Sequence, residues 1–397
     1  MRFSYSFLPL ALVALTFTPS ARAADPKVSD CLQPYVEKDE LAGAVVLVAS
    51  PDKVLALEAV GFADREAKIP MKTDDLFWIA SMSKPITAAA VMILVDEGKI
   101  SLDDPIEKYV PEFKNSMVIV DQDKDHMLLR KPKRPPTVRD CLRHTTGLPF
   151  SSVLEKPTFD RFLISDAVRS YAMTPLQYEP GTKHVYSNAG INTASRVIEV
   201  ASGMSFEDFL AKRLLTPLGM TDTTWRPNDE QLKRLAKSYR PGKGGKGLEA
   251  TTVTQVHYPL NDPARQPFAA GGLFSTAKDV GAFGQMILSG GMYNGKRILS
   301  EAAIREMTGT QTGDILNKGK GEGGYGLGLS TRKMAKKDGP VVAGPCGHGG
   351  AYATNLWIDP DTKIVTVYMV QHAGFPGDGG KAHGAFEQAA AKMYGMK

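Results

Sequence analysis

Cysteine, tryptophan and net charge are all scarce in this sequence. The three cysteines, Cys31, Cys141 and Cys346, are too few for a disulfide scaffold, and their odd number leaves at least one thiol free or in an intermolecular bridge. A formal net charge of +5 argues against a nucleic-acid-binding protein. The chain has no internal repeats and an ordinary share of hydrophobic residues, 43%. What remains is a packed globular protein of enzyme size.

Two common kinds of hydrolase site are also missing. There is no G-x-S-x-G sequence, which a Ser-His-Asp hydrolase of the α/β type places after a strand. The His-Gly-Gly triplet at 348–350 comes late, whereas that class places such a triplet before its nucleophile. The seven histidines stand singly, without the spacing of zinc ligands. We therefore expect neither a metal nor a cofactor.

Long apolar runs are absent except near the start of the chain. Arg2 precedes an apolar run over residues 7–17, and Ala21-Arg22-Ala23 follows it, which is the layout of a secretory signal with its cleavage site. The run is too short to span a bilayer comfortably. We predict cleavage after Ala23, a single exported domain over residues 24–397 without a stable membrane anchor, and a periplasmic or secreted location. Loss of Arg2 and Arg22 lowers the formal charge from +5 to +3.

The hydrophobic pattern changes twice along the mature chain. Strand-like alternation comes first, helix and loop patterns dominate from about 101 to 269, and strands then return before a terminal helix. This order predicts an α/β fold of the α+β type, with an antiparallel sheet flanked by helices. The sheet lobe would comprise about 24–100 and 270–397, with an all-helical lobe inserted at about 101–269. The expected strands are 42–50, 53–64, 324–331, 351–359 and 363–371; a Pro-Asp turn pair separates the first two, and the last two form an antiparallel hairpin. The expected helices include 85–98, 137–149, 192–203, 205–219, 276–291 and 382–394.

Two stretches of the inserted region have no helical pattern. Residues 121–135 are densely charged, which indicates a solvated excursion more than a basic binding patch. Residues 238–268 are rich in Gly, Pro and Lys and predict a long loop. Loops of that length often border a pocket, but the sequence does not show whether this one does.

The stretch "FWIASMSKPIT" (77–87) places a serine and a lysine at the start of a helix. Ser81 and Lys84 are spaced i, i+3, so their side chains share one face and can touch. A buried lysine loses solvation, its pKa falls, and it can act as a base toward the serine hydroxyl. The backbone N–H groups at the helix start are unpaired, so the N–H of Ser81 could also stabilise an oxyanion.

Two further polar clusters follow. In "HVYSNAG", Tyr186 could relay a proton and Asn188 could hold a substrate carbonyl, although Ser-Asn-Ala-Gly is also good turn chemistry. In "GHGGAYA", the glycines would let a substrate approach a strand edge, and the N–H of Ala351 would be a second oxyanion donor. Cys346 stands two residues before His348, so a Cys-His nucleophile is an alternative to a buried structural cysteine.

Taken together and in this order, Ser-x-x-Lys, Tyr-x-Asn and His-x-Gly resemble the motifs of the serine penicillin-recognising enzymes. The resemblance is to the class C β-lactamase group, which includes D-aminopeptidases, DD-carboxypeptidases and lactamase-like esterases, and it covers nearly all of the mature chain. It implies an active site between a sheet lobe and a helical lobe. The segments that carry it are "FWIASMSKPIT", "TVRDCLRHTTGLP", "PGTKHVYSNAGIN", "PLGMTDT" and "AAGGLFSTAKDV".

The resemblance also implies a role for each site residue. Ser81 would be acylated, and Lys84 and Tyr186 would share the proton transfers. Asn188, together with the strand that carries His348, Gly349 and Gly350, would bind the substrate. The N–H groups of Ser81 and Ala351 would form the oxyanion hole.

The third motif departs from the lactamase pattern. His348-Gly349-Gly350 stands where lactamases of the group carry Lys-Thr-Gly, whose lysine and threonine grip the β-lactam carboxylate. A neutral histidine attracts a carboxylate less than a lysine does. We therefore expect an esterase or a hydrolase of small amides or D-peptides, with a class C β-lactamase as the alternative. A non-catalytic penicillin-binding sensor would show degraded motifs, and all three motifs here hold chemically competent residues.

Overall fold

The computed structural model describes residues 1, 3, 4, 25–316, 323–333 and 338–396. Apart from residues 1, 3 and 4, the predicted signal sequence lies outside the described residues and stays a prediction. No helix within the described ranges is long and apolar enough to cross a membrane.

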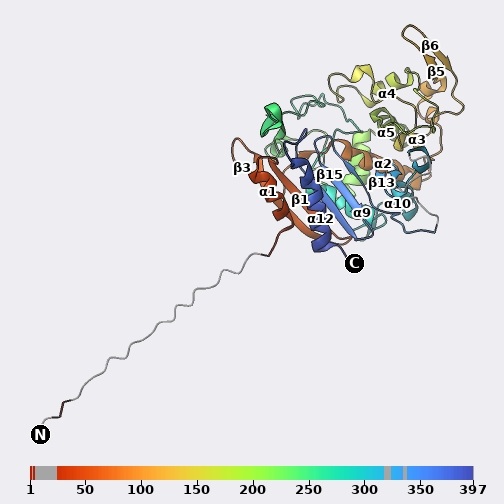
Figure 1. Ribbon diagram of the computed structural model, residues 1–397. Helices are drawn as coiled ribbons and strands as arrows, with labels where there is room; N and C mark the ends of the chain where they lie inside the picture. Colours follow the sequence, from red (N-terminus) through yellow and green to blue (C-terminus); the bar gives the residue numbers. More distant parts are fainter. Residues whose placement is uncertain (2, 5–24, 317–322, 334–337, 397) are drawn as a thin grey trace.

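An eight-stranded antiparallel sheet forms the centre of the molecule, as predicted (Figure 1). Strands from the two ends of the chain meet in its middle, because β1 pairs with β2 on one side and with β16 on the other. Both predicted hairpins, β1–β2 and β15–β16, are confirmed. In spatial order the strands are β12 (Gly324–Tyr325), β13 (Ser330–Thr331), β14 (Cys346–Gly349), β15 (Asn355–Asp359), β16 (Ile364–Met369), β1 (Gly43–Ala49), β2 (Val54–Asp64) and β3 (Ile69–Pro70).

Strand β1 is apolar at every position after its first because helices cover both faces of the sheet. Successive side chains of a strand point to opposite faces. Val45 and Leu47 belong to the core that includes α9 (Ala277–Leu288), whereas Val46 and Val48 belong to the core that includes α12 (Ala382–Tyr394). The predicted 324–331 strand is interrupted between β12 and β13, where Gly328 has a φ of 74°.

The inserted region leaves and re-enters the sheet lobe at one place. Strand β4 (Phe77–Trp78) precedes the insertion and pairs with β9 (Phe274–Ser275), which follows it. The region contains α3 (Val138–Leu142), α4 (Ile164–Ala172), α5 (Asn188–Ser202) and α6 (Phe206–Leu210). Helix α5 packs against α2 (Ser83–Asp96), α3, α4 and α6, so it is the central helix of this lobe.

The inserted lobe is not all-helical, contrary to the prediction. The charged excursion contains a hairpin of β5 (Val118–Gln122) and β6 (Met127–Arg130), which projects from the upper right of the molecule (Figure 1). Its turn is closed by the Asp123 carboxylate, which accepts hydrogen bonds from the N–H groups of Asp125 and His126. The predicted 238–268 loop begins with a second hairpin of β7 (Ser238–Pro241) and β8 (Leu248–Thr251), whose glycine-rich turn adopts positive φ angles.

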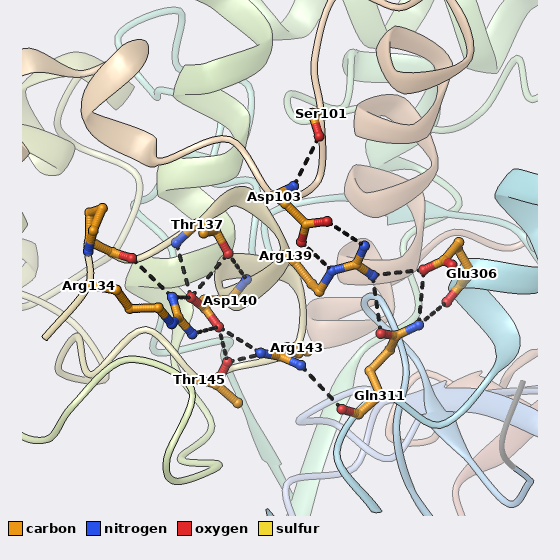
Figure 2. Close-up of polar contacts among 11 residues, drawn as sticks. Ser101, Asp103, Arg134, Thr137, Arg139, Asp140, Arg143, Thr145, Glu306 and Gln311 are labelled. Carbon is orange, nitrogen blue, oxygen red and sulfur yellow. Dashed lines mark hydrogen bonds and ion pairs between the residues drawn. The ribbon is translucent and has the colours of Figure 1, made fainter.

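A charged network joins the inserted lobe to the rest of the fold (Figure 2). From α3, Arg139 donates hydrogen bonds to Asp103 (2.8 Å) and to Glu306 (2.7 Å) of α10 (Glu301–Thr308). Asp140, with a fully buried side chain, accepts from Arg134 at 2.5 Å and from Arg143 at 3.0 Å. Burial alone would raise the pKa of Asp140, but its hydrogen bonds with Arg134 and Thr145 hold that pKa below its usual range.

Replacing Asp140 with asparagine should lower the free energy of unfolding by about 2 kcal/mol at pH 7, because two guanidinium groups lose a buried anionic partner. A carboxyl group whose pKa is depressed by folding stabilises the protein above its unfolded-state pKa, about 3.9, and that contribution disappears as pH falls through the lower folded-state value. Urea unfolding should therefore show a difference between wild type and variant that shrinks below about pH 4. Asp103→Asn is the control, since the Asp103 side chain is 72% exposed and should contribute little. An equal loss in both variants would contradict this account.

Candidate active site

Ser81 lies in a tight turn between β4 and helix α2. The turn is a short 3₁₀ helix, Ala80–Met82, and Ala80 adopts a φ of 46°, which a residue with a Cβ rarely does. Lys84 follows one helical turn later, and its Nζ lies 3.1 Å from Ser81 Oγ. The predicted contact between the two side chains is present.

The side chain of Lys84 is fully buried beside this turn. Its Nζ donates to Asn188 Oδ1 at 2.9 Å and to the Ala270 carbonyl at 2.7 Å. Burial lowers the pKa of Lys84 well below its usual value. Its hydrogen-bond partners are all neutral oxygens, so no carboxylate among them offsets the effect of burial on the ammonium form. A neutral amine at this position can take the proton of the Ser81 hydroxyl.

Tyr186 and Asn188 meet this pair from the start of α5. The loop before α5 is held by the Ser187 N–H, which donates to His144 Nδ1 at 3.2 Å, and by the Asn188 N–H, which donates to the Phe150 carbonyl at 3.0 Å. Lys84 Nζ lies 4.6 Å from the centroid of the Tyr186 ring. Burial raises the pKa of Tyr186 to about 12, although a hydrogen bond with Ser81 acts in the opposite direction. Tyr186 is thus a neutral phenol at rest, able to donate a proton.

His348 approaches Tyr186 from strand β14. Its Nδ1 lies 2.7 Å from the Gly349 carbonyl, an oxygen that can only accept, so we assign the ring proton to Nδ1. The Nε2 atom is then an acceptor, 3.0 Å from the Tyr325 hydroxyl and 3.5 Å from the Tyr186 hydroxyl. Burial, with a further effect of the nearby Lys84, lowers the pKa of His348 to about 3. His348 is therefore a neutral hydrogen-bond acceptor.

Ser81 and Ala351, the two predicted oxyanion donors, line the same cavity. Among the described residues, neither the N–H of Ser81 nor that of Ala351 has a hydrogen-bond partner. Gly350 allows β14 to come this close, because a Cβ at that position would lie 2.6 Å from the Ile79 carbonyl oxygen. Gly349 has ordinary space around it, so only the second glycine is required sterically. The arrangement suits a developing oxyanion.

A cavity of about 210 Å³ opens onto Ser81. Its walls are mostly apolar, and Gln255 and Phe268 show that the predicted 238–268 loop borders it. The Asp160–Arg265 ion pair anchors this loop at 2.7 Å, with both side chains at least 98% buried. The lining residues are Trp78, Ala80, Ser81, Phe150, Tyr186, Asn188, Gln255, Phe268, Ala270, Gly271 and Ala351.

Sequence reasoning missed a second group of buried residues behind Lys84. Asn192 Oδ1 accepts from the Ala270 N–H at 3.1 Å, which fixes the peptide segment whose carbonyl holds Lys84. The Asn192 amide in turn donates to Tyr171 at 3.0 Å and to Glu155 at 3.3 Å. Tyr325 was also missed as a partner of His348. The only signal available was position, since Asn192 stands one helical turn after Asn188 on α5.

Three alternatives to this site are a cysteine nucleophile, a metal site and a second pocket. Cys346 is fully buried, and burial raises its pKa to about 12, so its thiol is a poor nucleophile. Within the described ranges, no group of three or more His, Cys, Asp or Glu side chains could hold a metal ion. A larger pocket of about 490 Å³ lies beside β3 and residues 232–238, and it is lined by none of the predicted site residues.

Comparisons with known proteins give matches over most of the chain. The family model described as Beta-lactamase matches residues 28–390. The chain is 32% identical over 351 residues to Protein Rv1367c of Mycobacterium tuberculosis, covering 84% of this chain and 86% of that protein. It is 27% identical over 389 residues to Esterase EstB of Burkholderia gladioli, covering 92% and 94%. The solved structure of EstCE1, described as a hydrolase with promiscuous acyltransferase activity, shares the fold with a TM-score of 0.75 at 23% identity, covering 91% of this chain and 97% of that one.

Proposed function

Because the chain belongs to the beta-lactamase family and is a serine hydrolase of that family, we propose that it hydrolyses small neutral esters through an acyl-enzyme on Ser81. The observation that carries the proposal is the neutrality of the cavity around Ser81. None of its described lining residues is Lys or Arg, and His348 is an uncharged acceptor in the third motif. A neutral ester loses little by entering such a cavity, whereas a carboxylate would lose its hydration without gaining a cation.

Acylation begins when Lys84 Nζ removes the proton of Ser81 Oγ, which attacks the ester carbonyl carbon. The carbonyl oxygen becomes an oxyanion between the N–H groups of Ser81 and Ala351. As the intermediate collapses, Tyr186 donates its hydroxyl proton to the alkoxide leaving group and recovers a proton from Lys84. A water molecule then attacks the acyl carbon while Lys84 and Tyr186 take up its proton. The bond between that carbon and Ser81 Oγ breaks, Oγ receives the proton from the same groups, and the acid product leaves.

Small amides and D-peptides come second as substrates, and β-lactams third. A D-peptide of cell-wall type ends in a carboxylate, so it has the same difficulty as a β-lactam in a cavity without a cation. Acyl transfer to an alcohol in place of water is a second candidate activity, favoured by the aromatic walls that Phe150, Phe268 and Trp78 give the cavity. Apolar walls let an alcohol compete with water for the acyl-enzyme.

The test compares kcat/KM for p-nitrophenyl acetate and for nitrocefin, an anionic β-lactam. We expect the ester to be preferred by at least about 100-fold, the discrimination that one missing charged contact typically provides. His348→Lys should reduce the preference for the ester over nitrocefin by about tenfold, because the lysine supplies a cation for the nitrocefin carboxylate. His348→Asn is the neutral control and should not narrow it. Equal rates on both substrates with wild type would overturn the proposed substrate class.

We also propose that residues 1–23 are removed during export and that the mature protein is periplasmic or secreted. Support comes from the sequence pattern of Arg2, the apolar run and Ala21-Arg22-Ala23. Intact mass of the exported protein should correspond to a chain that begins at Ala24. A full-length chain retained in the cytosol would contradict export.

A further inference from the structure

The segment 150–163, termed the rim segment, exposes an unusual set of side chains beside the active-site cavity. Its apolar residues include Val153 at 81% exposure and Leu163 at 55%. Its exposed charged residues are both basic, Lys156 and Arg161. Within the described part of the chain, neither forms an ion pair with a carboxylate, and Arg161 contacts a ring nitrogen of His257 instead. The exposed residues are Phe150, Val153, Leu154, Lys156, Pro157, Arg161, Phe162 and Leu163.

The acidic residues of the rim segment point into the protein. Glu155 is 2% exposed and accepts hydrogen bonds from Tyr171 and Asn192. Asp160 is 1% exposed and is paired with Arg265. These two buried contacts fix the backbone and leave an outer surface that is apolar and positively charged.

The rim segment is continuous with the catalytic cavity through Phe150. This residue lines the cavity and yet is 49% exposed. Its ring stacks on Tyr186, with centroids 6.4 Å apart, and meets the Phe159 ring edge-on at 6.3 Å. A molecule bound to the rim segment would therefore lie next to the opening that leads to Ser81.

The β5–β6 hairpin provides a contrast within the same lobe. It also exposes apolar side chains, Leu128 at 61% and Val120 at 50%. There they stand among exposed charges of both signs, with the acids Asp121 and Asp125 beside the bases Lys124 and Arg130. The rim segment differs from the hairpin because its acids, Glu155 and Asp160, are buried, so its exposed charges are all positive.

We propose that the rim segment docks the protein on an anionic lipid surface, with the catalytic cavity opening toward that surface. Apolar side chains can enter the boundary between headgroups and acyl chains, while lysine and arginine pair with anionic headgroups. An ester dissolved in the lipid would then reach Ser81 past Phe150 without crossing water. Delivery of a lipid-dissolved ester to Ser81 rests on the proposed ester hydrolysis. Docking on the lipid surface does not depend on that activity and is measured separately.

The test is flotation of the full-length mature protein, residues 24–397, with vesicles of phosphatidylglycerol and phosphatidylcholine or of phosphatidylcholine alone. We expect binding to the anionic vesicles that weakens as salt is raised. Lys156→Gln combined with Arg161→Gln should weaken it on the order of 30-fold, since each basic residue near such a surface contributes about 1 kcal/mol. Val153→Asp combined with Leu154→Asp should abolish it. Leu128→Asp, on the β5–β6 hairpin, is the matched control and should bind like wild type.

Hydrolysis of soluble p-nitrophenyl acetate is measured on every variant and should stay unchanged, which shows that each one folds. Wild type that fails to float with anionic vesicles would overturn the proposal, even if ester hydrolysis is intact. So would binding that survives both double substitutions. A dimer in sedimentation velocity that is lost in the Val153→Asp, Leu154→Asp variant, without vesicle binding, would assign the surface to a second copy of the chain instead.

Discussion

Ser81→Ala is expected to abolish ester turnover, with a loss of at least about 10⁴-fold in kcat. The hydroxyl is the only group in the described cavity placed both against the amine of Lys84, at 3.1 Å, and beside two unpaired N–H donors. Without it, the cavity retains an oxyanion site and a base but has no atom that can form the acyl bond. The measurement is steady-state hydrolysis of p-nitrophenyl acetate, together with intact mass after mixing with a slowly deacylating ester.

Ser83→Ala is the matched control for this experiment. Ser83 is a buried serine at the start of α2, and its Oγ accepts a hydrogen bond from the Leu273 N–H at 3.3 Å, so it stabilises the backbone. The control should keep kcat within about threefold. Loss of one buried hydrogen bond lowers the free energy of unfolding by about 1 kcal/mol but leaves the reacting groups in place. An acyl adduct or full turnover in Ser81→Ala would show that another residue is the nucleophile.

Lys84→Met should reduce acylation by about 10²- to 10⁴-fold, the usual contribution of a positioned proton acceptor. Methionine fills the buried space without an amine, so the change removes chemistry more than packing. Lys84→Arg, which introduces a permanent cation that cannot act as a base, should be equally slow. Pre-steady-state release of p-nitrophenol measures the acylation step directly. A Lys84→Met variant within about tenfold of wild type would leave Lys84 only a structural role.

The pH dependence gives a further readout of the same residue. Because burial lowers the pKa of Lys84, acylation should rise with pH at values well below the ordinary lysine pKa of about 10.4. That rise should be absent in Lys84→Met. It should persist in His348→Asn, because His348, with a pKa lowered to about 3, does not titrate in the working range.

Sequence reasoning succeeded where the structure is local. Ser81 and Lys84 are one helical turn apart, so their contact follows from helix geometry and a short apolar stretch. The two sheet hairpins were likewise predicted from alternation and a turn between neighbours. The β5–β6 and β7–β8 hairpins were missed because their strands are short and their charged or glycine-rich turns dominate the composition.

Contacts between distant positions could not be read from the sequence. Tyr325 reaches His348 only because β12 to β14 assemble side by side, and Asn192 reaches Ala270 only because α5 packs under the returning chain. The inward direction of Glu155 and Asp160 depends on Tyr171 and Arg265, which nothing in the linear pattern links to them. The exposed character of the rim segment was hidden for the same reason, since its composition alone contains two acids.

The pairing of β1 with β16 has a consequence for synthesis of the protein. A ribosome delivers Ser81 and Lys84 well before β16, so β1 lacks its second neighbour for most of the synthesis of this fold. Sheets that depend on such distant strands form slowly and late. The nascent chain should therefore stay open and catalytically silent until β16 has been made.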